Sequence, residues 1–152
     1  MSIYRFMKPA LPTLAMVFLA AGESGAQQAT LFAVLNGGNV CSSVGAICRT
    51  GDPDGVGSAT ITIVSQTTLC FGLVVDNIGQ PTNVQLRAGP SGVNGPNVVS
   101  FPAPPSGDPG TASGCVTVAS AVLAPVIAAP QNFYVIVKNS SFSNGALRGQ
   151  LF

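Results

Sequence analysis

Residues 58–76 decide the fold class, because they read Ser-Ala-Thr-Ile-Thr-Ile-Val-Ser-Gln-Thr-Thr-Leu-Cys-Phe-Gly-Leu-Val-Val-Asp. Apolar side chains occupy every second position over Ser58–Val64 and again over Thr68–Asp76. A period of two is typical of strands with one buried face, whereas an amphipathic helix repeats about every 3.6 residues. The stretch therefore predicts two β-strands.

Working outward, alternation and turn residues mark six further strands. They are expected at Thr30–Leu35, Thr82–Ala88, Asn97–Phe101, Gly114–Val118, Phe133–Lys138 and Ala146–Phe152. Gly- and Pro-rich segments separate them, including a loop over residues 102–114, and one short helix is expected at Ser120–Ala129 with Ser120 as its N-cap. This pattern predicts an all-β fold: a Greek-key or immunoglobulin-like β-sandwich of about eight short antiparallel strands with at most one short helix.

The first 26 residues read as a secretory signal peptide. Arg5 and Lys8 form a positive start, and Ala10–Ala21 is an uncharged stretch too short to span a bilayer. Ser24-Gly25-Ala26 offers small residues before a cleavage site, although an uncleaved anchor is the alternative interpretation. Residues 27–152 are then expected to form one domain without a membrane span, in a secreted, periplasmic or cell-surface location.

Charge and composition exclude most chemistry from residues 27–152. They contain no histidine and no glutamate, and they carry as many acidic as basic side chains. The usual general base and the commonest metal ligand are therefore missing, and no basic field exists for nucleic acid. We expect no enzymatic activity, no cofactor and no nucleic-acid partner, but a binding or structural module whose partner is an unidentified protein or glycan.

The four cysteines predict disulfides, because exported chains meet an oxidising environment. Three pairings are possible. We favour Cys41 with Cys48, which closes a short loop, and Cys70 with Cys115, which joins two predicted strands. A metal site is the alternative, but the chain has neither histidine nor C-x-x-C spacing.

Three stretches carry a family resemblance. They are Leu-Phe-Ala-Val-Leu-Asn-Gly-Gly-Asn at 31–39, Arg-Ala-Gly-Pro-Ser-Gly-Val-Asn-Gly-Pro at 87–96, and Tyr-Val-Ile-Val at 134–137 with Asn-Gly-Ala-Leu-Arg-Gly-Gln-Leu at 144–151. Over nearly all of residues 27–152 the chain resembles the CHRD (chordin-type) domain of chordin and of many exported bacterial proteins. The resemblance implies an all-β, immunoglobulin-like or barrel-like domain outside the cytoplasm, in a family without a well-settled activity.

The chain departs from that family at polar positions. The family usually has an Ala-His-Ile-His-type strand and a Tyr-Val-Asn-Val-His strand, and here Gln85, Arg87 and Lys138 stand at the histidine positions. A metal site built on those histidines would be lost, because Arg and Lys are cations without a free lone pair. The sharper hypothesis is that the three residues converge as a small cationic site for an anion, a glycan or a partner carboxylate. Solvated strand faces are the alternative.

Two further features have structural interpretations. Arg148 lies between Leu147 and Leu151, which predicts a buried or half-buried arginine bonded to loop carbonyls rather than a catalytic one. Asp52 and Asp54, in Asp-Pro-Asp-Gly, hint at calcium, but no other carboxylate is close in sequence, so an ordinary turn is the preferred interpretation.

Overall fold

The computed structural model describes residues 28–42 and 47–152, so the expected signal peptide lies outside the described residues. Eight antiparallel strands form one sheet in the order β5-β4-β7-β8-β1-β2-β3-β6. Their bounds are β1 Ala29–Asn36, β2 Val56–Ser65, β3 Thr68–Asp76, β4 Pro81–Ala88, β5 Asn97–Phe101, β6 Gly110–Thr117, β7 Phe133–Asn139 and β8 Leu147–Gln150. The helix α1 spans Ser120–Ala128, and 3-10 turns lie at Gly37–Asn39 and Pro130–Asn132. The all-β prediction is confirmed.

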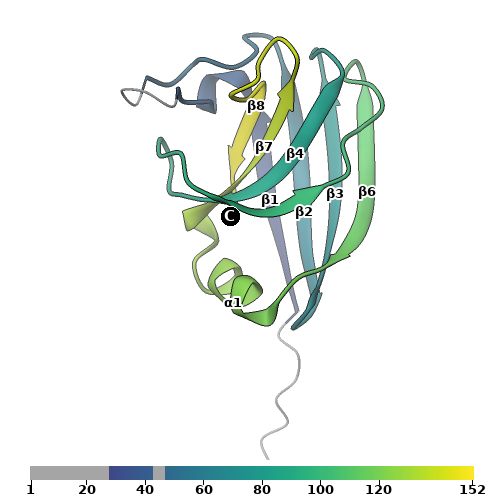
Figure 1. Cartoon of the computed structure of the whole chain (residues 1–152), viewed down its shortest axis with the longest axis vertical. Helices are drawn as coiled ribbons and strands as arrows, with labels where there is room; N and C mark the ends of the chain where they lie inside the picture. Colours follow the sequence, from purple (N-terminus) through teal and green to yellow (C-terminus); the bar gives the residue numbers. More distant parts are fainter. Residues whose placement is uncertain (1–27, 43–46) are drawn as a thin grey trace, which may run out of the picture.

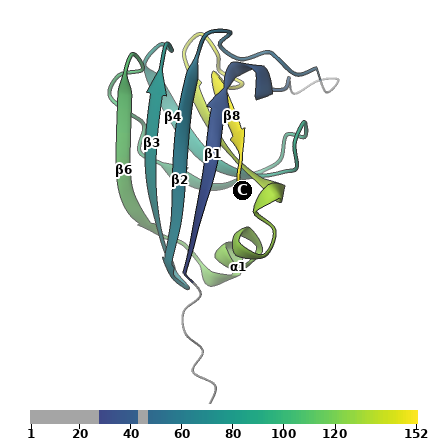
Figure 2. The same ribbon diagram turned by 180° about the vertical axis from the view of Figure 1, so that it is seen from behind.

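The sheet curls over on itself, so that β1, β2, β3 and β6 face β4, β5 and β7 across one core (Figures 1 and 2). Alternate side chains of the strands point inward and are apolar, as a strand with one buried face requires. Phe71 of β3 stacks on Phe101 of β5 with their ring centroids 4.6 Å apart, which joins the two halves. The sandwich-like arrangement is thus built from one hydrogen-bonded sheet.

Helix α1 lies at one end of the core, where it contributes the buried side chains of Leu123 and Val126 (Figure 1). The prediction of Ser120 as N-cap is wrong. Ala119 occupies that position and makes no side-chain hydrogen bond, because the first turn closes on the Ala119 carbonyl, which accepts from the Val122 N–H at 2.9 Å. The helix continues past Pro125, which lies inside it.

Some strand boundaries also differ from the prediction. The strand expected to begin at Gly114, after a loop over residues 102–114, begins four residues earlier: β6 starts at Gly110, which is paired with Val75. The start of β6 is Gly-Thr-Ala-Ser, which favours strands only weakly, and pairing with β3 holds it extended. Strand β2 begins at Val56 instead of Ser58, whereas β8 covers residues 147–150 instead of 146–152.

Candidate functional site

The outer face of the curled sheet has two different halves. The loops of residues 37–42 and 89–96 lie beside β7 and β8 (Figure 1), and Tyr134, Ile136 and Arg148 of these strands are buried. Over β1, β2, β3 and β6 no described element covers the strands (Figure 2). The candidate site belongs to the half formed by β4, β7 and β8, which we call the covered half, and to its margin.

Arg148 of β8 is the largest buried side chain of the covered half, with 1% of its surface exposed. Its guanidinium lies 3.6 Å from the centre of the Tyr134 ring. Its Nη2 donates to the carbonyls of Pro90 and Val93 at 3.0 and 2.9 Å, and its Nη1 donates to Asn94 Oδ1 at 3.1 Å. Among the described residues it forms no ion pair with a carboxylate. Carbonyl dipoles and an aromatic face thus surround its charge, which fits a structural role.

Asn94 ties the two covering loops together. Its Nδ2 donates to the carbonyls of Cys41 and Ser42 at 2.9 and 3.0 Å, while its Oδ1 accepts from Arg148. The Gly95 N–H donates to the Tyr134 hydroxyl at 3.2 Å. We call Arg148 with its partners Pro90, Val93, Asn94 and Tyr134 the arginine clamp. Sequence reasoning did not single out Asn94, because nothing local links it to β8.

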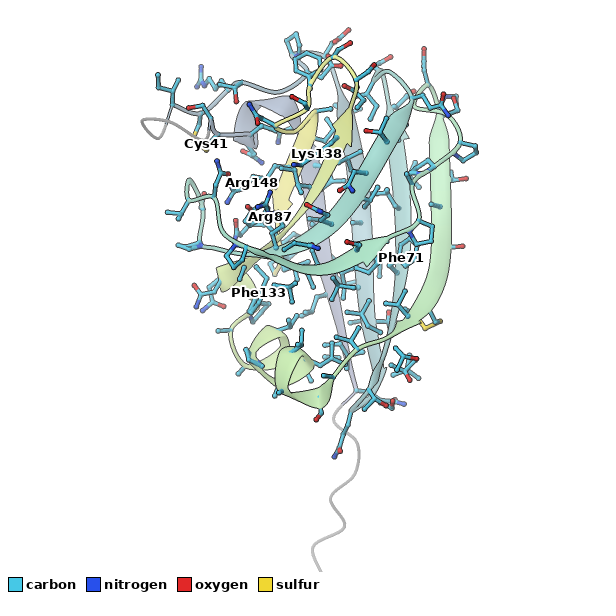
Figure 3. The ribbon with its side chains drawn as sticks, in the orientation of Figure 1. Cys41, Phe71, Arg87, Phe133, Lys138 and Arg148 are labelled. Carbon is cyan, nitrogen blue, oxygen red and sulfur yellow. A yellow bond between two sulfur atoms is a disulfide. The ribbon has the colours of Figure 1, made fainter. Side chains whose placement is uncertain are left out.

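Strands β4 and β7 place Gln85, Arg87 and Lys138 on one face of the sheet, beside the clamp. In the register Asn83 lies opposite Lys138, and Gln85 and Arg87 follow at two-residue intervals on the same side of β4. Figure 3 shows Arg87 and Lys138 on the same side as Arg148. We call Asn83, Gln85, Arg87 and Lys138 the cationic patch.

The cations of the patch are near enough to influence each other. Burial lowers the pKa of Lys138, and the charge of Arg87 lowers it further. Burial also lowers the pKa of Arg148. The charge of Arg87 lowers this pKa further, whereas the interaction with Tyr134 raises it. Arg87 Nε donates to the Gly95 carbonyl at 2.8 Å, whereas Lys138 has no side-chain hydrogen bond or ion pair with a described residue. The patch is therefore positive without a neutralising carboxylate.

Asn83 adds an unpaired polar group to the patch. Its Oδ1 is buried and accepts no hydrogen bond from any described residue. An unsatisfied buried carbonyl oxygen costs about 1–3 kcal/mol, so the rest of the structure must compensate for it. Together with the half-buried amide of Gln85, it places hydrogen-bonding groups among the cations.

Asp52 and Asp54 form a turn. Asp52 is buried, and its N–H donates to the Ala146 carbonyl at 2.9 Å. Burial raises the pKa of Asp52 above the ordinary 3.8. A side-chain hydrogen bond with Asp54 and the charge of Asp54 raise this pKa further, whereas a hydrogen bond with the Asp54 backbone lowers it. In the described part of the chain no three His, Cys, Asp or Glu side chains are grouped as a metal site would need.

Replacing Asp54 by Asn is expected to stabilise the fold at neutral pH. A carboxyl whose pKa is raised on folding contributes stability at low pH and loses it as the pH rises through the folded value. Removing the Asp54 charge makes the pKa of Asp52 rise less on folding, so less stability is lost between low and neutral pH. Urea midpoints should therefore be higher for Asp54→Asn than for the parent at pH 7 and equal at pH 3. A lower midpoint at pH 7 would show that the Asp54 carboxylate has a favourable partner.

Both expected disulfides are present in the structure. Cys41 is bonded to Cys48 and Cys70 to Cys115, with sequence separations of 7 and 45. The second bond joins directly opposite residues of β3 and β6 on the outer face of the sheet. It therefore fixes an edge strand to its neighbour.

The surface hollows lie away from the cationic patch. One of about 640 Å³ lies between α1 and residues Ser65 and Gln66, one of about 460 Å³ lies beside Gly37–Asn39, and one of about 420 Å³ lies over β2, β3 and β6. The residues of the cationic patch line none of these three hollows. In the described residues, no helix has the length and apolar character needed to cross a membrane.

Comparison with known proteins adds one finding to this geometry. The CHRD domain family matches residues 31–151, a range that includes the arginine clamp and the cationic patch. No curated protein and no solved structure matches the chain.

Proposed function

The chain belongs to the CHRD domain family, and from that premise we propose that it is an exported, non-catalytic module that binds an acidic glycan through its cationic patch. The leader-like residues 1–26 and the two disulfides support export, because disulfides persist in oxidising compartments. The extracellular or cell-surface location is part of the proposal.

The observation that carries the proposal is the uncompensated charge of Arg87 and Lys138. Lys138 is half-buried, and burial together with the Arg87 charge disfavours its protonated form. An anion placed between them would restore that form, because charge-assisted hydrogen bonds from Lys and Arg to an anionic oxygen are among the strong ones. The gain is available to a ligand since no described carboxylate forms an ion pair with either residue.

The amides of the patch favour a sugar acid over a simple anion. The half-buried amide of Gln85 offers donors and an acceptor at the surface, whereas the unpaired Oδ1 of Asn83 is buried. Sugar hydroxyls can pair with such groups while a carboxylate of the same residue meets the cations. The patch also extends over two neighbouring strands, from Arg87 on β4 to Lys138 on β7, which suits a polymer that lies across the sheet.

Neither catalysis nor metal binding fits the patch. Its side chains are two amides and two cations, with no carboxylate, imidazole or thiol. Arg and protonated Lys offer no lone pair to a metal ion, and the nucleophile–base pairs of hydrolases need groups that are absent here. Binding is therefore the activity that its chemistry supports.

Lys138→Met is expected to weaken binding of oligogalacturonate at least tenfold, about 1.4 kcal/mol, without lowering stability. The loss follows from removal of the unpaired cation, and stability is kept because the repulsion with Arg87 disappears. Isothermal titration gives the affinity, and urea unfolding gives the stability.

The matched control is Arg49→Met, which removes one positive charge from an exposed residue outside the patch. The affinity of Arg49→Met for oligogalacturonate should stay within about twofold of the parent value, because salt screens a charge that lies away from the ligand. Neutral galacto-oligosaccharides and a glutamate peptide complete the design. Equal losses in both variants would contradict the patch as the site, and equal binding of the peptide would contradict a glycan as the ligand.

A further inference from the structure

The uncovered outer face of β1, β2, β3 and β6 is unusual in its side chains. Six of the eight large hydrophobic residues that the described chain exposes lie on it or at its margin: Phe32, Val34, Val56, Val64, Val74 and Phe152. Between them are small and hydroxyl side chains of Ser58, Thr60, Thr62, Gly72, Thr111 and Ser113. The outward positions of these four strands hold a single charged residue, Asp76, at one end of β3. A face that is almost free of charge and exposes several large apolar side chains is a candidate interaction site.

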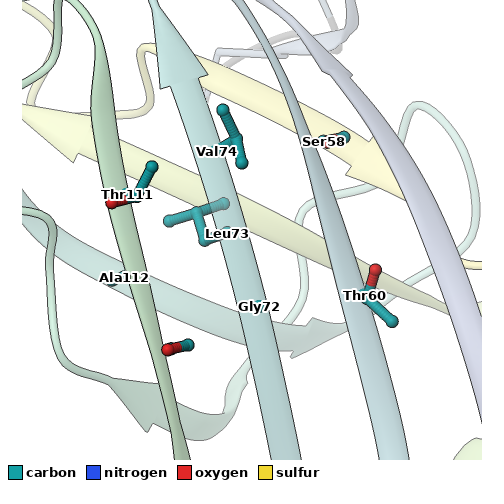
Figure 4. Close-up of a pocket in the computed structure, with 8 residues that line it drawn as sticks. Ser58, Thr60, Gly72, Leu73, Val74, Thr111 and Ala112 are labelled. Carbon is teal, nitrogen blue, oxygen red and sulfur yellow. The ribbon is translucent and has the colours of Figure 1, made fainter.

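This face has a ridge formed by Phe32 and Phe152, with a hollow beside it. Phe32 of β1 lies against Phe152, with ring centroids 6.3 Å apart, and 48% of Phe32 is exposed. In the register Phe32 is followed across the sheet by Thr60, Gly72 and Ser113. The hollow of about 420 Å³ lies there, over β2, β3 and β6, where Gly72 has no side chain (Figure 4).

We infer that this face packs against the same face of a second copy of the chain. A two-fold axis along β2 would place the Phe32 ridge of each copy opposite the Gly72 hollow of the other, so the surface is complementary to itself. Two such faces would pack as in a β-sandwich, about 10 Å apart.

The area and charge of the face fit this occupant. Four strands about 4.8 Å apart and roughly 30 Å long span about 570 Å² before side-chain relief is counted. Two such faces would bury roughly 1,100 Å² in total, which lies at the low end of the range for specific interfaces. With Asp76 at the rim, no like charges meet across the two-fold axis, and no basic residue among the outward positions would favour a lipid headgroup or another anionic partner.

The test uses Gly72→Lys, which places a charge in the hollow. No atom lies within 4 Å of a Cβ built at Gly72, and its φ is not in the left-handed region, so the folded monomer accommodates the change. Val34→Lys is a second variant on the same face. Ile47→Lys is the control, because Ile47 is about as exposed as Val34 but lies in the Cys41–Cys48 loop, away from this face.

Sedimentation velocity of the disulfide-intact protein over a range of concentrations is the measurement. We expect a dimer for the parent and for Ile47→Lys, and at least a hundredfold weaker association for Gly72→Lys and Val34→Lys, with urea midpoints of all four proteins alike. A monomeric parent, binding only another molecule through this face, would overturn the inference. The inference would also be overturned if the dimer persisted in both face variants, or if Ile47→Lys dissociated it equally.

Discussion

Arg148→Met is expected to destabilise the protein by about 3–5 kcal/mol, because it removes three charge-assisted hydrogen bonds and leaves their acceptors without a donor. Methionine fills much of the same space but leaves the carbonyls of Pro90 and Val93 without their donor, and buried unpaired carbonyls cost about 1–3 kcal/mol each. Urea unfolding followed by circular dichroism gives the change in free energy.

Two further variants serve as controls for Arg148→Met. Arg148→Lys keeps the charge but has no planar fork for several acceptors, so its loss should be intermediate. Arg87→Met removes a single hydrogen bond to Gly95 and should cost about 1 kcal/mol. Amide exchange should be faster at residues 89–96 in the Arg148 variants. A loss below 1 kcal/mol for Arg148→Met would show that the clamp does not hold the covering loop.

Cys70→Ser is expected to destabilise the protein by about 4 kcal/mol, because the bond with Cys115 closes a long loop in the unfolded chain. Cys41→Ser should cost about 2.5 kcal/mol, since its loop to Cys48 is short. Urea unfolding of the two variants under non-reducing conditions measures the difference.

Thiol labelling checks the pairing in the same variants. In Cys70→Ser the freed thiol should be that of Cys115, which is exposed on edge strand β6 and should react in the folded protein. Mass spectrometry of the labelled peptides identifies it. Comparable labelling of Cys41 would contradict the pairing, and an unchanged free energy of unfolding would contradict the expected contribution of the bond.

Strands could be predicted where apolar and polar residues alternate regularly, and less well where pairing with a neighbouring strand determines the extended conformation. The strands over Ser58–Val64 and Thr68–Asp76 could be predicted because apolar residues occupy every second position, as the alternating inward and outward side chains of a strand require. The start of β6 has no such pattern, and it is extended because β3 pairs with it. The strand order could not be read from the sequence at all, since it depends on contacts between distant segments.

Sequence reasoning singled out Gln85, Arg87, Lys138 and Arg148, but it missed Asn83 and Asn94 and could not give the arrangement of any of them. Arg148 could be expected to bond loop carbonyls from its apolar neighbours, but its acceptors lie 54 to 58 residues away in sequence. The same holds for Asn83, whose unpaired Oδ1 depends on burial between strands. The Gly-Val-Asn-Gly-Pro and Arg-Gly-Gln-Leu motifs meet in the arginine clamp, which gives two of the stretches that resemble the CHRD family a shared structural role.

The pKa of Lys138, measured with and without oligogalacturonate, tests the proposed function most directly. Lys138 is the only lysine after residue 8, so in protein without the leader one labelled lysine signal reports on the patch in an NMR titration. In the free protein the pKa should lie below the ordinary 10.5. A bound carboxylate should raise it, because an opposite charge favours the ammonium form. A saturating ligand that leaves this pKa unchanged would contradict binding at the cationic patch.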